Sequence, residues 1–268
     1  MISPIWTVGT YPSFLHSFVD RNSKGIIPLV YALQWNTHFE SLHMHDMGKL
    51  SNDVFTGVCA VTLRNSSLKE LAITGNTVVS KDFFGILVES IAANANSKLT
   101  ALDFSGLAVD DKAASVLASI VYRMPTGLSV LRMSDCNLTK KGITTILSSL
   151  KKTPLKSADT NGSASSLNMA HTSKFSMPLV DTLTNLDMSQ NAMPSEGILA
   201  LSEFLAMPNH LKKLTLSHCS ITNTEVIFGA LVRGCLQDLQ ILELDGNKFT
   251  TTENISPSFV SSYQAVLC

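Results

Sequence analysis

The stretch Leu128-Ser129-Val130-Leu131-Arg132-Met133-Ser134-Asp135-Cys136 carries apolar residues at its first, fourth and sixth positions and a cysteine at its ninth. The same spacing returns along the chain, often with Asn or Cys at the ninth position, and a weaker first copy begins at Phe39. A single copy would mean little, but copies at a near-constant period indicate stacked repeats that share one continuous core. The clear copies begin at Leu68, Leu99, Leu128, Leu183, Leu211 and Leu239.

This spacing is the leucine-rich repeat pattern. The first leucines are 31, 29, 55, 28 and 28 residues apart, which leaves room for a strand, a turn and a full helix in each repeat. Apolar pairs fifteen and eighteen positions after the first leucine share one helix face. These pairs are Phe83 and Ile86, Ala114 and Leu117, Ile143 and Ile146, and Ile198 and Leu201. The sequence therefore predicts an α/β solenoid, a leucine-rich repeat horseshoe of the ribonuclease-inhibitor type. Parallel strands should line its concave face and helices its convex face.

The chain divides into regions by repeat register. Residues 1–25 follow no register, and residues 26–268 are expected to form a solenoid of about seven repeats. The 55-residue step is one repeat plus an insertion at about 153–180, whose low-complexity run at 161–166 predicts a flexible loop. The segment 258–267 is expected to be a helix. No polar capping repeat follows it, so we expect the chain to be part of a longer solenoid.

The composition narrows the class of protein. The formal net charge is −1 and the basic residues are dispersed, which argues against a nucleic-acid partner. No apolar run reaches the roughly 18 residues of a transmembrane helix, so membrane association should be peripheral at most. The five cysteines form no CxxC pair. Cys136 and Cys219, at ninth positions, are expected to be buried reduced thiols, as in a reducing compartment.

Side chains alternate along a strand, so the residues that flank the inward leucines should face the concave surface. That surface is polar and mildly acidic and would suit a protein partner with basic residues; the alternative is a solvated face. In the second case Arg132, between Asp103 and Asp187, would form surface ion pairs worth less than about 1 kcal/mol each. The candidate protein-binding residues are Asp103, Arg132, Asp187, Thr215, Glu243 and Asp245.

The sequence offers little for catalysis or cofactor binding. It contains no GxSxG, HExxH or phosphate-loop motif. His43 and His45 share one strand face near Asp46, but the sequence places no further metal ligand beside them. We therefore expect a non-enzymatic protein with no catalytic residue, no cofactor and no metal.

Longer segments are more specific than the leucine spacing. Four segments resemble the CARMIL family, the capping-protein, Arp-complex and myosin-one linkers. They are residues 226–237 (VIFGALVRGCLQ), 27–36 (IPLVYALQWN), 201–209 (LSEFLAMPN) and 257–259 (PSF). The resemblance covers roughly residues 25–268, with one gap at the insertion.

The resemblance implies a scaffold that regulates the actin cytoskeleton, with actin-regulatory proteins as partners. It implies a cytoplasmic location at the actin-rich cortex or plasma membrane, as in lamellipodia and cell migration. The family's capping-protein-binding tail has no counterpart in these residues, so we expect this chain alone not to uncap filaments. Other leucine-rich repeat modules remain alternatives: a tropomodulin-like actin binder, a Ran-type GTPase activator or the repeats of an innate-immune receptor.

Overall fold

A computed structural model describes residues 5–9, 26–45, 49–75, 77–78, 82–121, 124, 126–151, 179–223, 225–234 and 237–249. Most of the predicted insertion at 153–180 and the predicted helix at 258–267 lie outside these residues. The strands of the main sheet are β1 (Ile5–Gly9), β2 (Ser41–His45), β4 (Glu70–Thr74), β6 (Ala101–Asp103), β7 (Val130–Arg132), β8 (Asn185–Asp187), β9 (Lys213–Thr215) and β10 (Ile241–Glu243). The short strands β3 (Lys49–Leu50) and β5 (Thr77–Val78) pair separately. The helices are α1 (Ile27–Leu33), α2 (Asn52–Arg64), α3 (Phe83–Ala93), α4 (Asp111–Ile120), α5 (Lys140–Ser149), α6 (Leu179–Thr182), α7 (Ser195–Leu205) and α8 (Glu225–Gly234).

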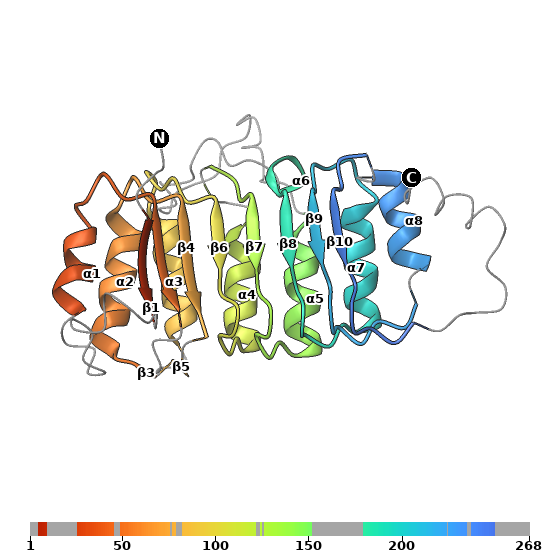
Figure 1. The fold of residues 1–268 in the computed structure, drawn as a ribbon, viewed down its shortest axis with the longest axis horizontal. Coiled ribbons are helices and arrows are strands. Elements are labelled where there is room, and N and C mark those ends of the chain that lie inside the picture. Colours follow the sequence, from red (N-terminus) through yellow and green to blue (C-terminus); the bar gives the residue numbers. More distant parts are fainter. Residues whose placement is uncertain are drawn as a thin grey trace, which may run out of the picture.

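The strands form one open parallel sheet in the order β1-β2-β4-β6-β7-β8-β9-β10. Figure 1 shows this sheet along one side of an elongated molecule, with the helices in a row behind it. Apart from the short α6, the helices of neighbouring repeats pack against one another, as α4 does against α5 and α5 against α7. The prediction of an α/β solenoid with strands on one side and helices on the other is confirmed. Residues 5–9, expected to be outside the repeats, add the strand β1 in parallel register with β2.

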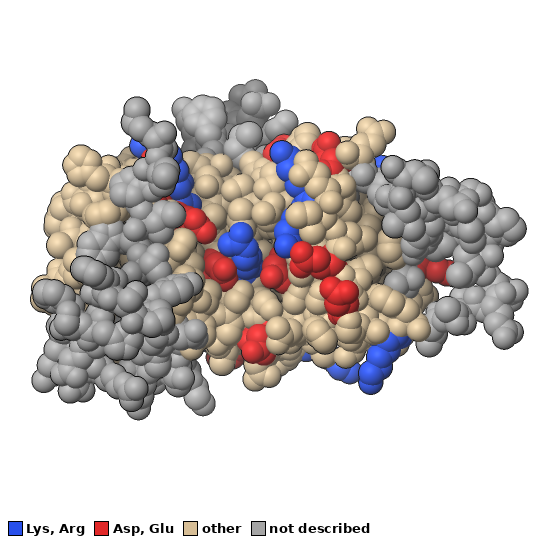
Figure 2. All heavy atoms as spheres, in the orientation of Figure 1, with Lys and Arg blue, Asp and Glu red and all other residues tan. Residues whose placement is uncertain are grey.

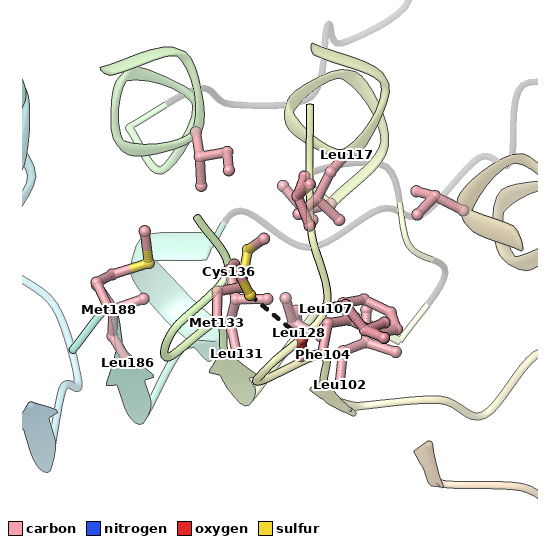
Figure 3. Close-up of a cluster of buried hydrophobic side chains, with 14 of the residues drawn as sticks. Leu102, Phe104, Leu107, Leu117, Leu128, Leu131, Met133, Cys136, Leu186 and Met188 are labelled. Atoms are coloured by element: carbon pink, nitrogen blue, oxygen red, sulfur yellow. Dashed lines mark hydrogen bonds between the residues drawn. The ribbon is translucent and has the colours of Figure 1, made fainter. Parts of the chain in front are cut away.

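The repeated apolar positions build the core. The middle leucine of each strand is paired with the middle leucine of the next, as Leu102 is with Leu131 and Leu131 with Leu186. The apolar residue two positions later, such as Phe104 or Met133, is fully buried as well. Figure 3 shows these side chains pointing from the strands toward the helices, where Leu117 of α4 meets them. The inward columns therefore form one core that runs through all these repeats.

One of the predicted helix faces is wrong. Ile86 was expected to be buried beside Phe83, but its side chain is 53% exposed. In α3 the buried residue at the corresponding place is Leu87, nineteen positions after Leu68, whereas Leu117 follows Leu99 by eighteen. The repeat that begins at Leu68 is longer than its neighbours, and the added residues shift its helix by one position. A shift of one residue turns a helical side chain by about 100° and moves it off the buried face.

The ninth positions of the repeats form a ladder where the chain leaves the sheet. The Asn191 side chain accepts hydrogen bonds from the backbone N–H groups of Cys136 and Leu138 and donates to the carbonyl of Met133 at 2.8 Å. Asn247 bonds the repeat before its own in the same way, through the N–H groups of Cys219 and Ile221. The thiols of Cys136 and Cys219 donate to the carbonyls of Phe104 and Met188. Asn and Cys recur at this position because each satisfies buried backbone groups of the adjoining repeat.

The two ladder cysteines should be chemically inert in the folded chain. Both are buried free thiols, and burial raises the pKa of Cys136 to about 12 and that of Cys219 to about 11. Because the thiolate is the reactive form, both stay protonated at pH 8. We expect iodoacetamide at pH 8 to leave both residues unmodified in the native chain and to alkylate both in guanidinium, as measured by peptide mass spectrometry. Rapid native labelling of either would contradict this placement.

A second asparagine ladder, which the sequence analysis missed, lies where the helices end. Asn65 donates to the carbonyls of Leu33 and Asn36 at 2.7 and 2.8 Å, and Asn94 donates in turn to the carbonyls of Thr62 and Asn65. The signal was present, because Asn36, Asn65 and Asn94 are each 29 residues apart. These bonds fix the height at which the early repeats stack.

Within the described residues, no helix combines the length and apolar character needed to cross a bilayer.

Candidate protein-binding surface

The open face of the sheet carries two rows of outward side chains, one on each side of the buried leucine column. The strand register sets both rows, since residues paired across neighbouring strands lie in line. One row runs through Ser41, Glu70, Ala101, Val130, Asn185, Lys213 and Ile241. The other runs through His43, Ala72, Asp103, Arg132, Asp187, Thr215 and Glu243. Figure 2 shows acidic and basic groups gathered over the middle strands of this face.

Arg132 lies at the centre of an ionic cluster. Its Nη1 is 3.6 Å from Oδ2 of Asp103 and 3.9 Å from Oε1 of Glu70. Glu70 also lies 3.4 Å from Nε2 of His43. The expected contact of Arg132 with Asp103 is present, whereas the described side chains form no ion pair between Arg132 and Asp187. Arg132 is 39% exposed, so a partner can still reach its guanidinium.

Glu70 was not among the predicted residues. It directly precedes the second leucine of its repeat, Leu71, whereas all the candidate residues follow the second leucine of theirs. Strand β4, which carries Glu70, is separated from β7, which carries Arg132, by the single strand β6. The long arginine side chain reaches across β6 to Glu70. The alternation of side chains along β4 was a usable signal, because residues two apart on a strand share a face.

Asp103 and Asp187 each stabilise the turn that follows their own strand. In each case Oδ1 accepts a hydrogen bond from the backbone N–H two residues later, that of Ser105 at 3.0 Å and that of Ser189 at 2.9 Å. This bond stabilises the bend that follows the strand. An asparagine at either position would keep the acceptor oxygen and remove only the charge.

The C-terminal part of the face differs from the prediction at one residue. Thr215 was expected to offer its side chain to a partner, but it is only 6% exposed between Asp187 and Glu243 in its row. Glu243 accepts a hydrogen bond from Nζ of Lys213 at 2.7 Å, which lowers the pKa of the Glu243 carboxyl. Asp245 lies past the end of β10 and is exposed.

The two histidines of β2 contact each other and a neighbouring strand on the same face of the sheet. The rings of His43 and His45 meet edge to face with centroids 5.5 Å apart, and His45 Nδ1 contacts the hydroxyl of Thr74. Asp46 lies outside the described residues. Across the described part of the chain, no group of three or more His, Cys, Asp or Glu side chains is placed to hold a metal ion.

The sheet, the helix row and the repeated core define a solenoid of strand–helix repeats. No family model matches the chain. Over 225 residues it is 29% identical to Protein CARMIL of Dictyostelium discoideum, which covers 84% of this chain and 19% of that protein. It is 27% identical over 237 residues to mouse capping protein, Arp2/3 and myosin-I linker protein 3, covering 87% and 15%. It is also 25% identical over 240 residues to the Rho GTPase-activating protein gacW of D. discoideum, covering 90% and 18%.

The chain is related to the CARMIL family. It spans less than a fifth of the length of each of these relatives. Among solved structures it resembles a chain of the yeast Rad7–Elc1 complex, at 13% identity and a TM-score of 0.26 over 87% of this chain and 75% of that one. A likeness of that size carries no argument about fold or function.

Proposed function

We propose that the chain is a leucine-rich repeat solenoid of the ribonuclease-inhibitor type that serves as a non-enzymatic scaffold in actin regulation. The observation that carries the functional part is its similarity to Protein CARMIL and to a protein named as a linker of capping protein, Arp2/3 and myosin-I. The repeat type is supported by the buried leucine columns, the Asn and Cys ladder, and one helix behind each of the central strands. The chain would then work in the cytoplasm, near the actin-rich cortex.

The open sheet face is the proposed docking surface. Its carboxylates, from Glu70 to Asp245, outnumber its cations Arg132 and Lys213, so the face favours a partner with basic side chains. Complementary charge would raise the association rate and select the partner more than it would add affinity. Asp187 and Asp245 matter most, since no ion pair within the described residues neutralises either of them.

A GTPase-activating function has one supporting observation, the similarity to the protein named gacW. The same stretch of this chain matches proteins whose names carry different activities, and it spans a small part of each. A module shared in this way is better suited to recognition than to the particular activity of one relative. Catalytic amounts of the chain should therefore leave the GTP hydrolysis rate of a Rho GTPase unchanged.

The test uses charge-only variants and purified partners. We expect the immobilised chain to bind at least one of capping protein, Arp2/3 complex and a myosin-I tail, with affinity that falls as salt rises. The double variant Asp187→Asn/Asp245→Asn should weaken binding by about fivefold to thirtyfold, because each of the two lost charge pairs is worth about 0.5–1 kcal/mol at a rim. Asp187→Asn keeps the acceptor for Ser189, so the turn should survive. Biolayer interferometry measures the change.

The matched control removes the same number of charges from the helix side. Asp53→Asn/Glu89→Gln alters exposed carboxylates on α2 and α3 and should bind like the parent chain. Equal weakening by both pairs would contradict the assignment of the sheet face. Absence of binding to all the partners would contradict the proposed function. Pyrene-actin assembly on capped filaments should show no uncapping by micromolar chain.

A further inference from the structure

The first helix of the solenoid presents an uncharged, aromatic surface. The α1 sequence IPLVYAL contains no charged residue. Tyr31 is 38% exposed, Trp35 just beyond the helix is 73% exposed, and Leu63 at the end of α2 is 42% exposed. Tyr31 lies in the last turn of α1, and Trp35 follows in the turn that ends this helix. With Arg64 these residues form what we call the α1 patch: Tyr31, Trp35, Leu63 and Arg64.

The backbone that carries the exposed Trp35 side chain is held by hydrogen bonds. The backbone N–H of Trp35 donates to the carbonyl of Ala32, and that of Asn36 donates to the carbonyl of Leu33, so a hydrogen-bonded turn holds both residues at the end of α1. The carbonyl of Asn36 accepts from the Asn65 side chain at 2.8 Å, which ties this turn to the next repeat. A side chain held on a fixed backbone loses little conformational entropy when a partner covers it.

Arg64 adds a positive charge to the patch. Its guanidinium carbon lies 5.6 Å from the centre of the Trp35 ring, in cation–π contact. The described residues place no carboxylate in an ion pair with Arg64. Lys69, five residues later, is by contrast paired with Glu40 at 2.7 Å. The charge of Arg64 is thus left for a group that comes from elsewhere.

We propose that the α1 patch docks a segment of a second protein that is both apolar and acidic. An apolar side chain would cover Trp35 between Tyr31 and Leu63, and a neighbouring carboxylate would pair with Arg64. Trp, Tyr and Arg are the residues in which interface binding energy concentrates. Here Arg64 contacts Trp35, and Tyr31 is exposed four residues before Trp35, where α1 packs on α2. The α1 patch belongs to the helix side, and its partner has the opposite charge to the one proposed for the sheet face. The two proposals can therefore fail separately.

The experiment selects ligands without assuming their identity. A phage-displayed library of random peptides of about twelve residues is selected on the whole chain, with removal of phage that bind the Trp35→Ser chain. We expect enriched peptides to place Asp or Glu beside Leu, Phe or Ile. Their affinity should fall at least about tenfold in Trp35→Ser and in Arg64→Gln. It should be unchanged in the matched controls Leu199→Ser and Arg233→Gln, which alter exposed residues of α7 and α8.

Other occupants of the patch would give different results. In a Trp6→Phe background, Trp35 is the sole tryptophan, and acrylamide should quench its fluorescence freely in the unbound chain. Protection from acrylamide in the monomer would mean that this chain covers its own patch. A dimer that Trp35→Ser abolishes in sedimentation would make a second copy the occupant. Either result, an enriched set without acidic residues, or equal loss in the controls would overturn the proposal.

Discussion

Leu131→Asp is expected to unfold the central repeats. Leu131 is fully buried between Leu102 and Leu186, so an ionised aspartate there would have no partner and no water. Burying such a group costs several kcal/mol, which is a large share of the stability of a domain of this size. Each repeat also stabilises its neighbours, so the loss should spread along the solenoid. Circular dichroism and thermal melting should show lost helix signal, aggregation or a melting temperature lowered by more than about 10 °C.

The matched control for this variant is Val130→Asp. It places the same group one residue away, where the side chain points to the open face and is partly exposed. We expect nearly parental melting, since a surface substitution usually changes stability by less than about 0.5 kcal/mol. Leu214→Asp, at the equivalent buried position of β9, should repeat the effect of Leu131→Asp. Unchanged melting of both core variants would refute the inward register of the leucines.

Asn191→Ala should be the second most damaging change. The Asn191 side chain is buried and bonds two backbone N–H groups and the carbonyls of Met133, Met188 and Ser189. Alanine would leave the N–H groups of Cys136 and Leu138 without their acceptor in a site closed to water, whereas the Met188 carbonyl would keep the Cys219 thiol. At about 1–3 kcal/mol for each of these two unsatisfied N–H groups, a loss of roughly 2–6 kcal/mol is expected. The midpoint of urea unfolding measures it.

The comparison variant is Asn247→Ala. Asn247 makes the same kinds of bond, to the N–H groups of Cys219 and Ile221 and the carbonyls of Leu216 and Leu244, but it is only partly buried. Water can replace some of these bonds, so the loss should be about half that of Asn191→Ala or less. A larger loss for Asn247→Ala would show that burial does not set the cost.

The sequence by itself determined the architecture. The spacing of Leu128, Leu131 and Met133 reports which side chains avoid water, and the alternation along a strand is a local property of the backbone. The ninth-position residues Asn191 and Cys136 identified the turns for the same reason, since a buried backbone group needs a nearby polar atom. Repetition then implied the stacking, because one repeat cannot bury its own apolar face.

The tertiary structure alone decided which side chains meet. The cluster of Glu70 with Arg132 depends on the lateral register of strands that are about thirty or more residues apart in sequence, and no local pattern encodes that distance. Ile86 is exposed because the longer connection before α3 shifts the buried face of this helix by one residue. Thr215 is buried, although its position in the strand is the same as that of Arg132. The proximity of Trp35 and Arg64 follows from the packing of α1 on α2. Periodicity fixes the direction in which a side chain points, whereas the neighbours it finds there depend on how separate repeats stack.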